Sequence, residues 1–242
     1  MTVLFHISDL HFGREDRQAL RWFAAVVEAE RPAGIVVTGD VTQAARRSEF
    51  AAATAWLRAL PAPVSIEIGN HDIPVYNPVK RAFFPYRRYE RLRRQIARPL
   101  ELEGISIVPL RTATRGQWRS NWSLGVVRRR SLETALATLG RVPAGQLAVV
   151  ACHHPLVDEP ALASSGRTRG GVRALEALAA AGAHAVISGH VHDPFDVAWP
   201  TASGDIRLIG AGTLSERTRD TPPSFNEIAV QDGALVVRVR TA

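Results

Sequence analysis

The fold is decided first at residues 3–13, which read VLFHISDLHFG. Residues 3–8 are an apolar run with the length of a buried strand, and Asp9 and His11 follow it directly. Two further apolar runs, at 35–38 and 64–68, also end in polar residues, and a helical pattern separates each run from the next. This strand–helix–strand–helix–strand series predicts an α/β fold that begins with parallel strands.

The rest of the chain continues the alternation of strands and helices. The two helical patterns of the first half place apolar residues on one face, namely Leu20, Phe23, Ala24 and Val27, then Phe50, Ala53, Leu57 and Leu60. Further strands are predicted at 105–110, 124–127, 147–152 and 183–188, with helices over 131–139 and around Val172, Leu175 and Leu178. Asp232-Gly233 predicts a hairpin between two apolar runs. With no repeat and no linker, residues 1–242 are interpreted as one domain.

The composition is that of a soluble globular protein, with 46% apolar and 22% charged residues among 242. Cys152 is the single cysteine, which excludes an internal disulfide and a zinc-binding thiolate cluster, and favours a reducing compartment. The N-terminus lacks the pattern of a signal peptide, and no apolar run approaches the ~18 residues of a membrane span. We therefore expect a cytoplasmic protein without membrane insertion, and the sequence does not indicate its oligomeric state.

Polar residues able to bind a metal recur where the predicted strands end, which is where α/β sheets bind ligands. They are Asp9 and His11 (DLH), Asp40 (GD), Asn70, His71 and Asp72 (GNHD), His153 and His154 (HHP), and His190 and His192 (GHVH). Each motif alone arises by chance, but five at successive strand ends favour a single site. The i, i+2 spacing predicts that the DLH and GHVH pairs each lie on one side of an extended segment. The glycines at 39, 69 and 189 are expected to let the backbone turn tightly there.

This set of Asp, Asn and His side chains suits two divalent or trivalent metal ions, with Mn, Fe and Zn as candidates. It is too large for one tetrahedral ion, which takes about four ligands. Two ions that share a carboxylate would use all of these ligands, and such pairs cleave phosphate esters. The residues therefore indicate phosphate ester hydrolysis.

The adjacent histidines of HHP are not equivalent. Successive side chains of an extended strand point to opposite faces, so one of His153 and His154 faces the site and the other faces away. The following Pro155 favours an extended conformation at His154. Alternation alone does not say which histidine is the ligand.

The order and spacing of these motifs resemble the calcineurin-like metallophosphoesterase superfamily over nearly the whole chain. The HHP form and residues 210–230, GAGTLSERTRDTPPSFNEIAV, are similar to its bacterial cyclic-nucleotide phosphodiesterase branch. The resemblance implies a four-layer α/β/β/α sandwich with mixed sheets and a dimetal site at the carboxyl ends of the strands.

The resemblance also implies a role for each motif residue. The first ion would be held by Asp9, His11, Asp40 and His192, and the second by Asp40, Asn70, His153 and His190. Asp40 would bridge the ions, and His71 would act on the leaving group without binding metal. His154 would then lie beside the ligands, and Asp72 would either orient His71 or cap the turn, with the turn role favoured.

The function expected is metal-dependent hydrolysis of small-molecule phosphodiesters, cyclic nucleotides or similar, by attack of a dimetal-bound hydroxide on phosphorus. A nuclease acting on DNA or RNA and a hydrolase of phospholipid headgroups or pyrophosphates stay open as alternatives. So does a non-catalytic interaction module, against which the complete ligand set argues. Nucleic acid is the less favoured partner, because 242 residues leave no room for the DNA-capping and coiled-coil elements of repair nucleases.

The formal net charge is +7, and Lys80 is the only lysine, so the basic residues are almost all arginine. Residues 80–98 are rich in arginine and aromatic residues, and form either a wall for an anionic substrate or a helix with a solvated basic face, which we favour. Arg167 and Arg169, in the loop after His153, are candidate phosphate-binding residues.

Overall fold

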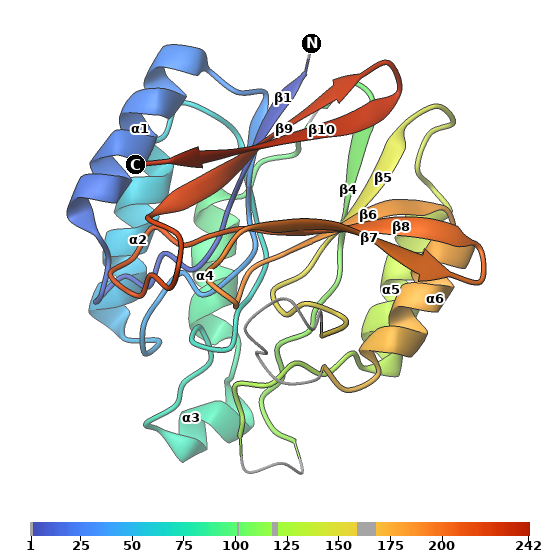
Figure 1. Cartoon of the computed structure of the whole chain (residues 1–242). Helices are drawn as coiled ribbons and strands as arrows, with labels where there is room; N and C mark the ends of the chain where they lie inside the picture. The colour runs from blue at the N-terminus through green and yellow to red at the C-terminus, as the bar shows by residue number, and fades with distance from the viewer. Residues whose placement is uncertain (1, 101, 118–120, 159–167) are drawn as a thin grey trace.

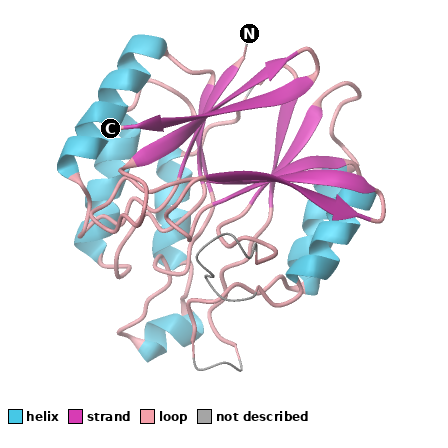
Figure 2. Cartoon of the chain, viewed as in Figure 1, coloured by secondary structure: helices cyan, strands magenta, loops and turns pink. Residues whose placement is uncertain are grey.

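Two β-sheets stacked face to face form the centre of the molecule, and helices cover the outer face of each sheet (Figure 1 and Figure 2). This computed structural model describes residues 2–100, 102–117, 121–158 and 168–242. Both sheets contain parallel and antiparallel strands, so the predicted α/β class with mixed sheets is confirmed.

The first sheet contains the series predicted from the start of the chain. Strands β1 (Val3–Ile7), β2 (Gly34–Val37) and β3 (Val64–Ile66) run parallel, and helices α1 (Arg17–Glu30) and α2 (Arg47–Ala59) connect them. Their parallel arrangement brings the carboxyl ends of all three strands to one edge of the sheet, at the lower end in Figure 1.

The C-terminal end of the chain completes this sheet, whose strand order is β10-β9-β1-β2-β3. Strand β9 (Ser224–Gln231) pairs antiparallel with β1, and β10 (Ala234–Thr241) pairs antiparallel with β9. Asp232 and Gly233 connect the last two strands with φ angles of 50° and 75°. Two positive φ angles are those of a type I′ turn, so the predicted hairpin is confirmed.

The second sheet has the strand order β4-β5-β6-β8-β7. Its strands are β4 (Ile105–Pro109), β5 (Leu147–Ala151), β6 (Ala183–Ser188), β7 (Phe195–Thr201) and β8 (Gly204–Gly210). All neighbours in it are parallel except β7 and β8. The loops after β5 and β6 therefore reach the same end of the molecule as those after β1, β2 and β3 (Figure 1).

Three separate apolar cores account for the four layers of the predicted sandwich. In β1, Phe5 packs in the core under α1 and α2, whereas Leu4 belongs to the core between the sheets. In β5, Val149 faces the core between the sheets and Val150 faces the outer helices. Those helices are α5 (Arg129–Leu139) and α6 (Gly171–Ala180). Strands buried on both faces explain the continuous apolar runs of the sequence.

The arginine-rich segment forms two helices, α3 (Pro78–Phe83) and α4 (Arg87–Ile96). Pro85 interrupts them, because a proline disfavours helical geometry at the residue before it, here Phe84. The predicted inner face is found in α4, whose buried residues are Tyr89, Leu92 and Ile96. In α3, Phe83 is 71% exposed, so that helix lacks a buried apolar face.

Two local predictions are wrong. Residues 124–127 form no strand, and only one isolated bridge joins Val126 to Arg169. Val172 is 48% exposed at the start of α6, while Leu175 and Leu178 are buried as expected. Within the part of the chain described, no helix is long and apolar enough to cross a membrane.

Candidate metal centre

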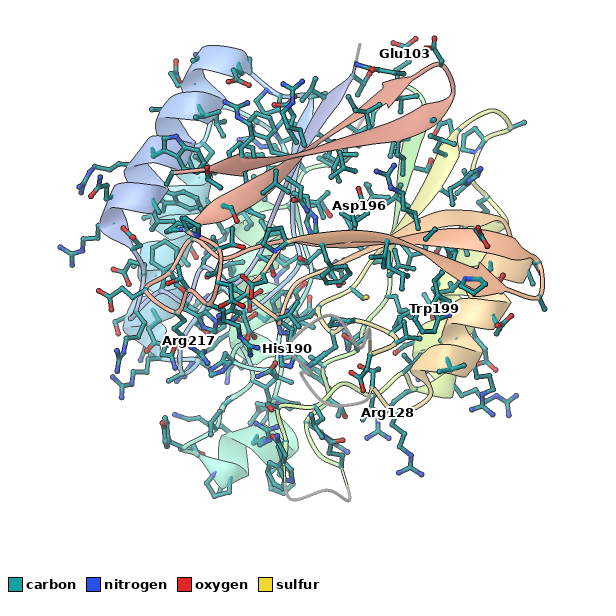
Figure 3. All side chains as sticks on the ribbon, viewed as in Figure 1. Glu103, Arg128, His190, Asp196, Trp199 and Arg217 are labelled. Carbon is teal, nitrogen blue, oxygen red and sulfur yellow. The ribbon has the colours of Figure 1, made fainter. Side chains whose placement is uncertain are left out.

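The loops that follow β1, β2, β3, β5 and β6 meet at one end of the sandwich and bring the seven predicted ligands together. Six of the seven are buried, namely Asp9, His11, Asp40, Asn70, His153 and His192. Figure 3 shows His190, the least buried of the set, at this end of the sheets. Side chains from both halves of the chain therefore share one location.

The backbone of the ligand loops is unusual. Five predicted ligands have positive φ angles, at 54° for Asp9, 44° for His11, 48° for Asp40, 73° for His190 and 64° for His192. Non-glycine residues rarely adopt this left-handed conformation, and it concentrates at functional sites. The extended geometry predicted for the DLH and GHVH pairs is wrong, because tight turns and not strand alternation bring these side chains inward.

The three glycines next to the ligands act in two different ways. Gly39 has a φ of 96°, as a tight turn requires. Gly69 and Gly189 have no positive φ. A Cβ on Gly69 would collide with the backbone N and carboxylate of Asp40, and one on Gly189 with the hydroxyl of Ser8. The predicted turn role therefore holds for Gly39, whereas the other two glycines permit close approach between loops.

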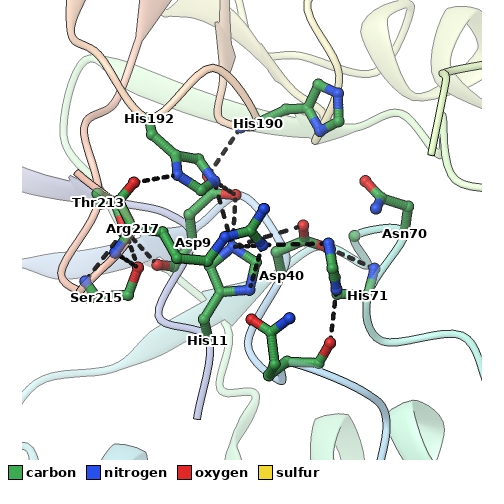
Figure 4. Close-up of polar contacts among 12 residues, drawn as sticks. Asp9, His11, Asp40, Asn70, His71, His190, His192, Thr213, Ser215 and Arg217 are labelled. Carbon is green, nitrogen blue, oxygen red and sulfur yellow. Dashed lines mark hydrogen bonds and ion pairs between the residues drawn. The ribbon is translucent and has the colours of Figure 1, made fainter. Parts of the chain in front are cut away.

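The first cluster contains Asp9, His11 and His192. Asp9 Oδ1 lies 3.2 Å from Nε2 of His192 and 3.5 Å from Nε2 of His11, and these two nitrogens are 3.3 Å apart. The other Asp9 oxygen, Oδ2, accepts the backbone N–H of His190 at 2.8 Å. Oδ1 is buried with no hydrogen-bond donor. His192 Nδ1 donates to the carbonyl oxygen of Arg217 at 2.6 Å, which leaves the lone pair of Nε2 directed at Asp9 (Figure 4).

The second cluster is centred on His153. Its Nδ1 donates to the carbonyl oxygen of Thr38 at 2.7 Å, and its Nε2 lies 3.0 Å from Asn70 Oδ1 and 3.3 Å from Asp40 Oδ2. The ring of His190 lies edge-to-face with that of His153 at 5.1 Å between centroids. Asp40 Oδ2 is also 3.9 Å from His11 Nε2, so this carboxylate lies between the two clusters.

The donor atoms of both clusters fit a pair of cations. A buried carboxylate oxygen without a donor is costly, and lone pairs of imidazole nitrogens and carboxylate oxygens face one another across about 3 Å. Cations placed among these atoms would satisfy them. A set of ligand atoms made of carboxylate or amide oxygens and imidazole nitrogens, with no sulfur, suits Mn, Fe and Zn.

His71 and Asp72 are neighbours with separate contacts. His71 Nδ1 donates to the carbonyl oxygen of Gln43 at 2.6 Å, and its backbone N–H donates to Asp40 Oδ1 at 2.8 Å. The carboxylate of Asp72 accepts N–H groups of Gly69 at 3.0 Å and Thr42 at 2.9 Å. Asp72 thus joins the loops after β2 and β3, which matches the turn role and not the orientation of the His71 ring.

His154 does not face away from the site as simple alternation predicts, since its ring packs 4.7 Å from that of His153 and 4.6 Å from that of His190. Nδ1 lies 2.9 Å from the hydroxyl of Thr112, and Nε2 donates to the carbonyl oxygen of Ser123 at 2.8 Å. Both ring nitrogens of His154 are thus paired, and the ring lies close enough to His153 and His190 for the three to form a group that could hold a metal ion.

The charges of the clusters are strongly coupled. Burial favours the neutral ring of His153, but the charge and hydrogen bond of Asp40 outweigh it and raise the pKa of His153 to about 9. Burial likewise opposes ionisation of Asp40, yet His153 holds the pKa of that carboxyl well below its usual value. Burial and the charge of His153 lower the pKa of His190 to about 4. A proton on His153 thus balances the carboxylate charge when no cation does.

Arg217 is the residue that the sequence analysis missed. Its Nη1 lies 3.3 Å from Nε2 of His11 and 3.3 Å from Nε2 of His71, so its guanidinium covers the first cluster (Figure 4). The residue lies in the 210–230 stretch that carried the family resemblance, but nothing in its spacing separates it from Arg219. Only the fold shows which arginine reaches the site.

The two arginines predicted to bind phosphate have different outcomes. Arg167 lies outside the described residues. Arg169 lines a cavity of about 520 Å³ together with Trp122 and Arg128. No hydrogen bond or ion pair joins the Arg169 side chain to either cluster within the described chain, so the structure does not bring it together with the predicted ligands.

Comparison with known proteins agrees with this geometry. A sequence model described as calcineurin-like phosphoesterase matches residues 2–194. No curated protein matches the chain significantly. A dimetal phosphatase from Danio rerio has a similar structure, with a TM-score of 0.71 and 16% identity over 99% of this chain and 96% of that one.

Two further solved structures share the fold. Purple acid phosphatase PPD1 from yellow lupin seeds gives a TM-score of 0.70 and 13% identity, over 99% of this chain and 51% of that one. Phosphopantetheinyl Hydrolase from Mycobacterium tuberculosis gives a TM-score of 0.57 and 19% identity, over 88% of this chain and 90% of that one. At these identities the likeness concerns the arrangement of sheets, helices and loops.

Proposed function

The chain belongs to the calcineurin-like phosphoesterase family, and from that premise we propose that it hydrolyses small-molecule phosphodiesters, such as cyclic nucleotides, with two bound metal ions. The observation that carries the proposal is that two histidine Nε2 atoms lie against the buried Oδ1 of Asp9, which has no hydrogen-bond donor, and a third lies against Oδ2 of Asp40. The reducing cytoplasm is the proposed location, which the single free Cys152 supports.

The chain offers a complete set of ligands for two ions. Asp9, His11, Asp40 and His192 would hold the first, and Asp40, Asn70, His153 and His190 would hold the second. When bound, such a pair lowers the pKa of a coordinated water and offsets negative charge on phosphoryl oxygens. Hydrogen bonds from Nδ1 of His153 and His192 to backbone carbonyls fix the rings with Nε2 beside the carboxylates of Asp40 and Asp9, where each Nε2 would be available to an ion.

Arg217 is proposed to bind the phosphate group. Its guanidinium is already held over the first cluster, and its planar fork can donate two parallel hydrogen bonds to phosphoryl oxygens. In the structure it contacts His11, one of the proposed ligands, and His71, which follows the proposed ligand Asn70. Movement of Arg217 onto a phosphate would free Nε2 of His71.

His71 is proposed to protonate the departing oxygen. The hydrogen bond from Nδ1 to Gln43 fixes its ring, and Nε2 then points toward Arg217 and the first cluster. An alkyl phosphodiester releases an alkoxide, which needs a proton to leave, and a histidine at this place can supply that proton. The similarity of residues 210–230 to the cyclic-nucleotide branch supports the same substrate class.

The proposal is tested by a turnover panel after reconstitution with Mn, Fe or Zn. We expect a phosphodiester and a cyclic nucleotide to be cleaved faster than a phosphomonoester. Asp40→Asn should lose both ions and activity toward all of them, whereas His184→Asn, on β6 outside the clusters, should behave as wild type. A clear preference for the monoester would contradict the diester assignment.

A further inference from the structure

One projecting segment carries most of the exposed apolar side chains of the molecule. Of nine large hydrophobic residues exposed in the described chain, five lie between residues 75 and 84, namely Val75, Tyr76, Val79, Phe83 and Phe84. Tyr76 is 80% exposed and Phe83 is 71% exposed. Helix α3 stands off the body at the end where the ligand loops meet (Figure 1). Exposed apolar groups that gather in this way mark a binding surface.

This apolar tip, residues 75–84, is attached to the body by hydrogen bonds. Asn77 caps α3 by accepting the N–H of Lys80 at 2.8 Å, and Pro78 begins the helix. Arg81 is the one residue of α3 that is buried, and its guanidinium donates to the carbonyl oxygens of Arg115 at 2.7 Å and Pro74 at 3.2 Å. Helix α3 is thus attached to the body through the polar side chain of Arg81, and its apolar side chains face the solvent.

The stretch that runs from the apolar tip through α4, residues 75–98, carries a high net positive charge. Residues 75–98 contain eight basic residues and one acidic residue, Glu90, a net charge of +7 that equals that of the whole chain. Helix α4 exposes three arginines at spacings of four and three residues, which places them along one helical face, and a fourth is exposed two residues past its end. They are Arg87, Arg91, Arg94 and Arg98.

These four arginines are not neutralised within the described chain. Glu90 of α4 forms ion pairs with Arg93 and with Arg111, and none of the four arginines forms one. The guanidinium of Arg87 lies 5.9 Å from the ring centroid of Phe84. That contact connects the arginine row to the apolar tip, so the two features form one surface.

We propose that residues 75–98 are a peripheral binding surface for a bilayer of anionic lipids. The apolar tip enters the interface between headgroups and acyl chains, while Lys80 and the first arginines of α4 contact headgroup phosphates. An apolar face bordered by basic residues is the pattern by which proteins bind such membranes without spanning them. This function is separate from hydrolysis at the metal centre.

Two other occupants fit the surface less well. Nucleic acid would stack on the aromatic rings but would gain nothing from Val75 and Val79, which have no planar face. A second copy of the chain would set one +7 segment against another, and the repulsion would oppose pairing. Lipid accommodates aliphatic, aromatic and arginine side chains together.

The location relates the surface to the metal centre. Only Ile73 and Pro74 separate Asp72, in the loop that bears Asn70 and His71, from the apolar tip. Both residues are buried and hold the tip to the ligand loop. A protein bound through the tip would therefore work with its catalytic end near the membrane.

The proposal is tested by sedimentation of the full chain with vesicles of phosphatidylcholine, with and without about 30% phosphatidylserine. We expect binding to the anionic vesicles that weakens as salt rises. Phe83→Ser with Phe84→Ser, and separately Arg91→Glu with Arg94→Glu, should each reduce it about tenfold or more. Val236→Ser with Val239→Ser, on exposed positions of β10, is the matched control and should bind as wild type.

Three outcomes would overturn the proposal: no binding to anionic vesicles, equal binding to both vesicle types, or variants that bind as wild type. A single-stranded oligonucleotide bound in place of vesicles, or a dimer abolished by Phe83→Ser with Phe84→Ser, would assign the surface to that other occupant. Turnover of a soluble diester should be unchanged in all these variants. Membrane binding and the proposed hydrolysis can thus fail independently.

Discussion

At the scale of single residues, the geometry of the candidate metal centre depends on which ring nitrogen of each histidine carries the proton and which keeps its lone pair. His153 and His192 each donate one ring N–H to a backbone carbonyl, so their other nitrogens face the carboxylates of Asp40 and Asp9. Arg217 contributes twice, through its carbonyl oxygen to His192 and through its guanidinium over the cluster. Substitutions can separate these contributions.

Metal affinity should depend steeply on pH because of His153. Cation binding needs the neutral ring, and the protonated ring predominates below its pKa of about 9. Affinity should therefore fall about tenfold for each pH unit below about 9 and level off above it. Titration of the metal-free protein with Zn from pH 6 to 10 measures this. An affinity independent of pH across that range would contradict a protonated His153.

His71→Ala should keep both metal ions but lose about 10²- to 10⁴-fold in kcat on a diester with a poor, alkyl leaving group. A nitrophenyl diester, whose leaving group needs no proton, should be affected much less. Metal content by elemental analysis provides the control. If the variant cleaved the alkyl diester at the wild-type rate, His71 would not be the acid.

Arg217→Ala should lower kcat/KM by about 10- to 100-fold, the effect of losing a hydrogen bond to a charged group. Metal content should stay unchanged, because the carbonyl oxygen that accepts from His192 belongs to the backbone. Arg219→Ala, an exposed neighbour, is the matched control. Loss of metal in Arg217→Ala would show instead that the side chain stabilises the cluster.

At the scale of elements, the loops at the strand ends matter more than the strands that carry them. Left-handed backbone conformations orient the ligand side chains toward the site. Gly69 and Gly189 permit close contact between neighbouring loops, and the carboxylate of Asp72 joins two loops by accepting backbone N–H groups. The precision of the site is therefore a property of contacts between neighbouring loops. A small displacement of one loop should therefore shift the ligand side chains of the neighbouring loop.

Gly69→Ala should disturb the centre although it changes no ligand. The new methyl group would overlap the backbone N and carboxylate of Asp40, and a misplacement of about 1 Å costs on the order of 100-fold in rate. Activity and metal content measure this effect. Gly116→Ala, where a Cβ meets nothing within 4 Å, is the matched control. Wild-type activity in Gly69→Ala would mean that the loops adjust freely.

The sequence predicted most elements because apolar runs and helical faces are local patterns. It located all seven candidate ligands, since each follows a run long enough to read as a strand. It could not predict Arg217, one arginine among many, because its place depends on how the loop after β8 folds over β1. The strand expected at 124–127 failed because a short apolar run does not show whether a neighbouring strand is available.

At the scale of the whole molecule, the two sheets depend on each other through the metal centre. Asp9 and Asp40 come from the first sheet, whereas His153, His190 and His192 come from the second. Ions that bind residues of both sheets would therefore hold the two halves of the sandwich together. Stability should consequently depend on metal occupancy.

Removing the metal ions should lower the melting temperature. A ligand at 100 times its Kd adds about 2.7 kcal/mol, and each kcal/mol shifts Tm by roughly 2–4 °C in a chain of this size. We expect chelation to reduce Tm by about 5–10 °C for each ion lost, and readdition of Mn or Zn to restore it. Calorimetry measures the change. An unchanged Tm would mean that the empty centre is equally stable.

The pairing of β1 with β9 sets the order in which the protein can mature. During synthesis β1 leaves the ribosome long before β9, so the edge of β1 that pairs with β9 stays open until β9 has been made. An unpaired strand edge can form β-sheet hydrogen bonds with other chains. Thr213 Oγ1 donates to the carbonyl oxygen of Asp9 at 2.6 Å. The ligand loop after β1 therefore also lacks this contact until the loop before β9 has been made. A nascent chain therefore cannot complete the first sheet or the metal centre until β9 and the loop before it have been made.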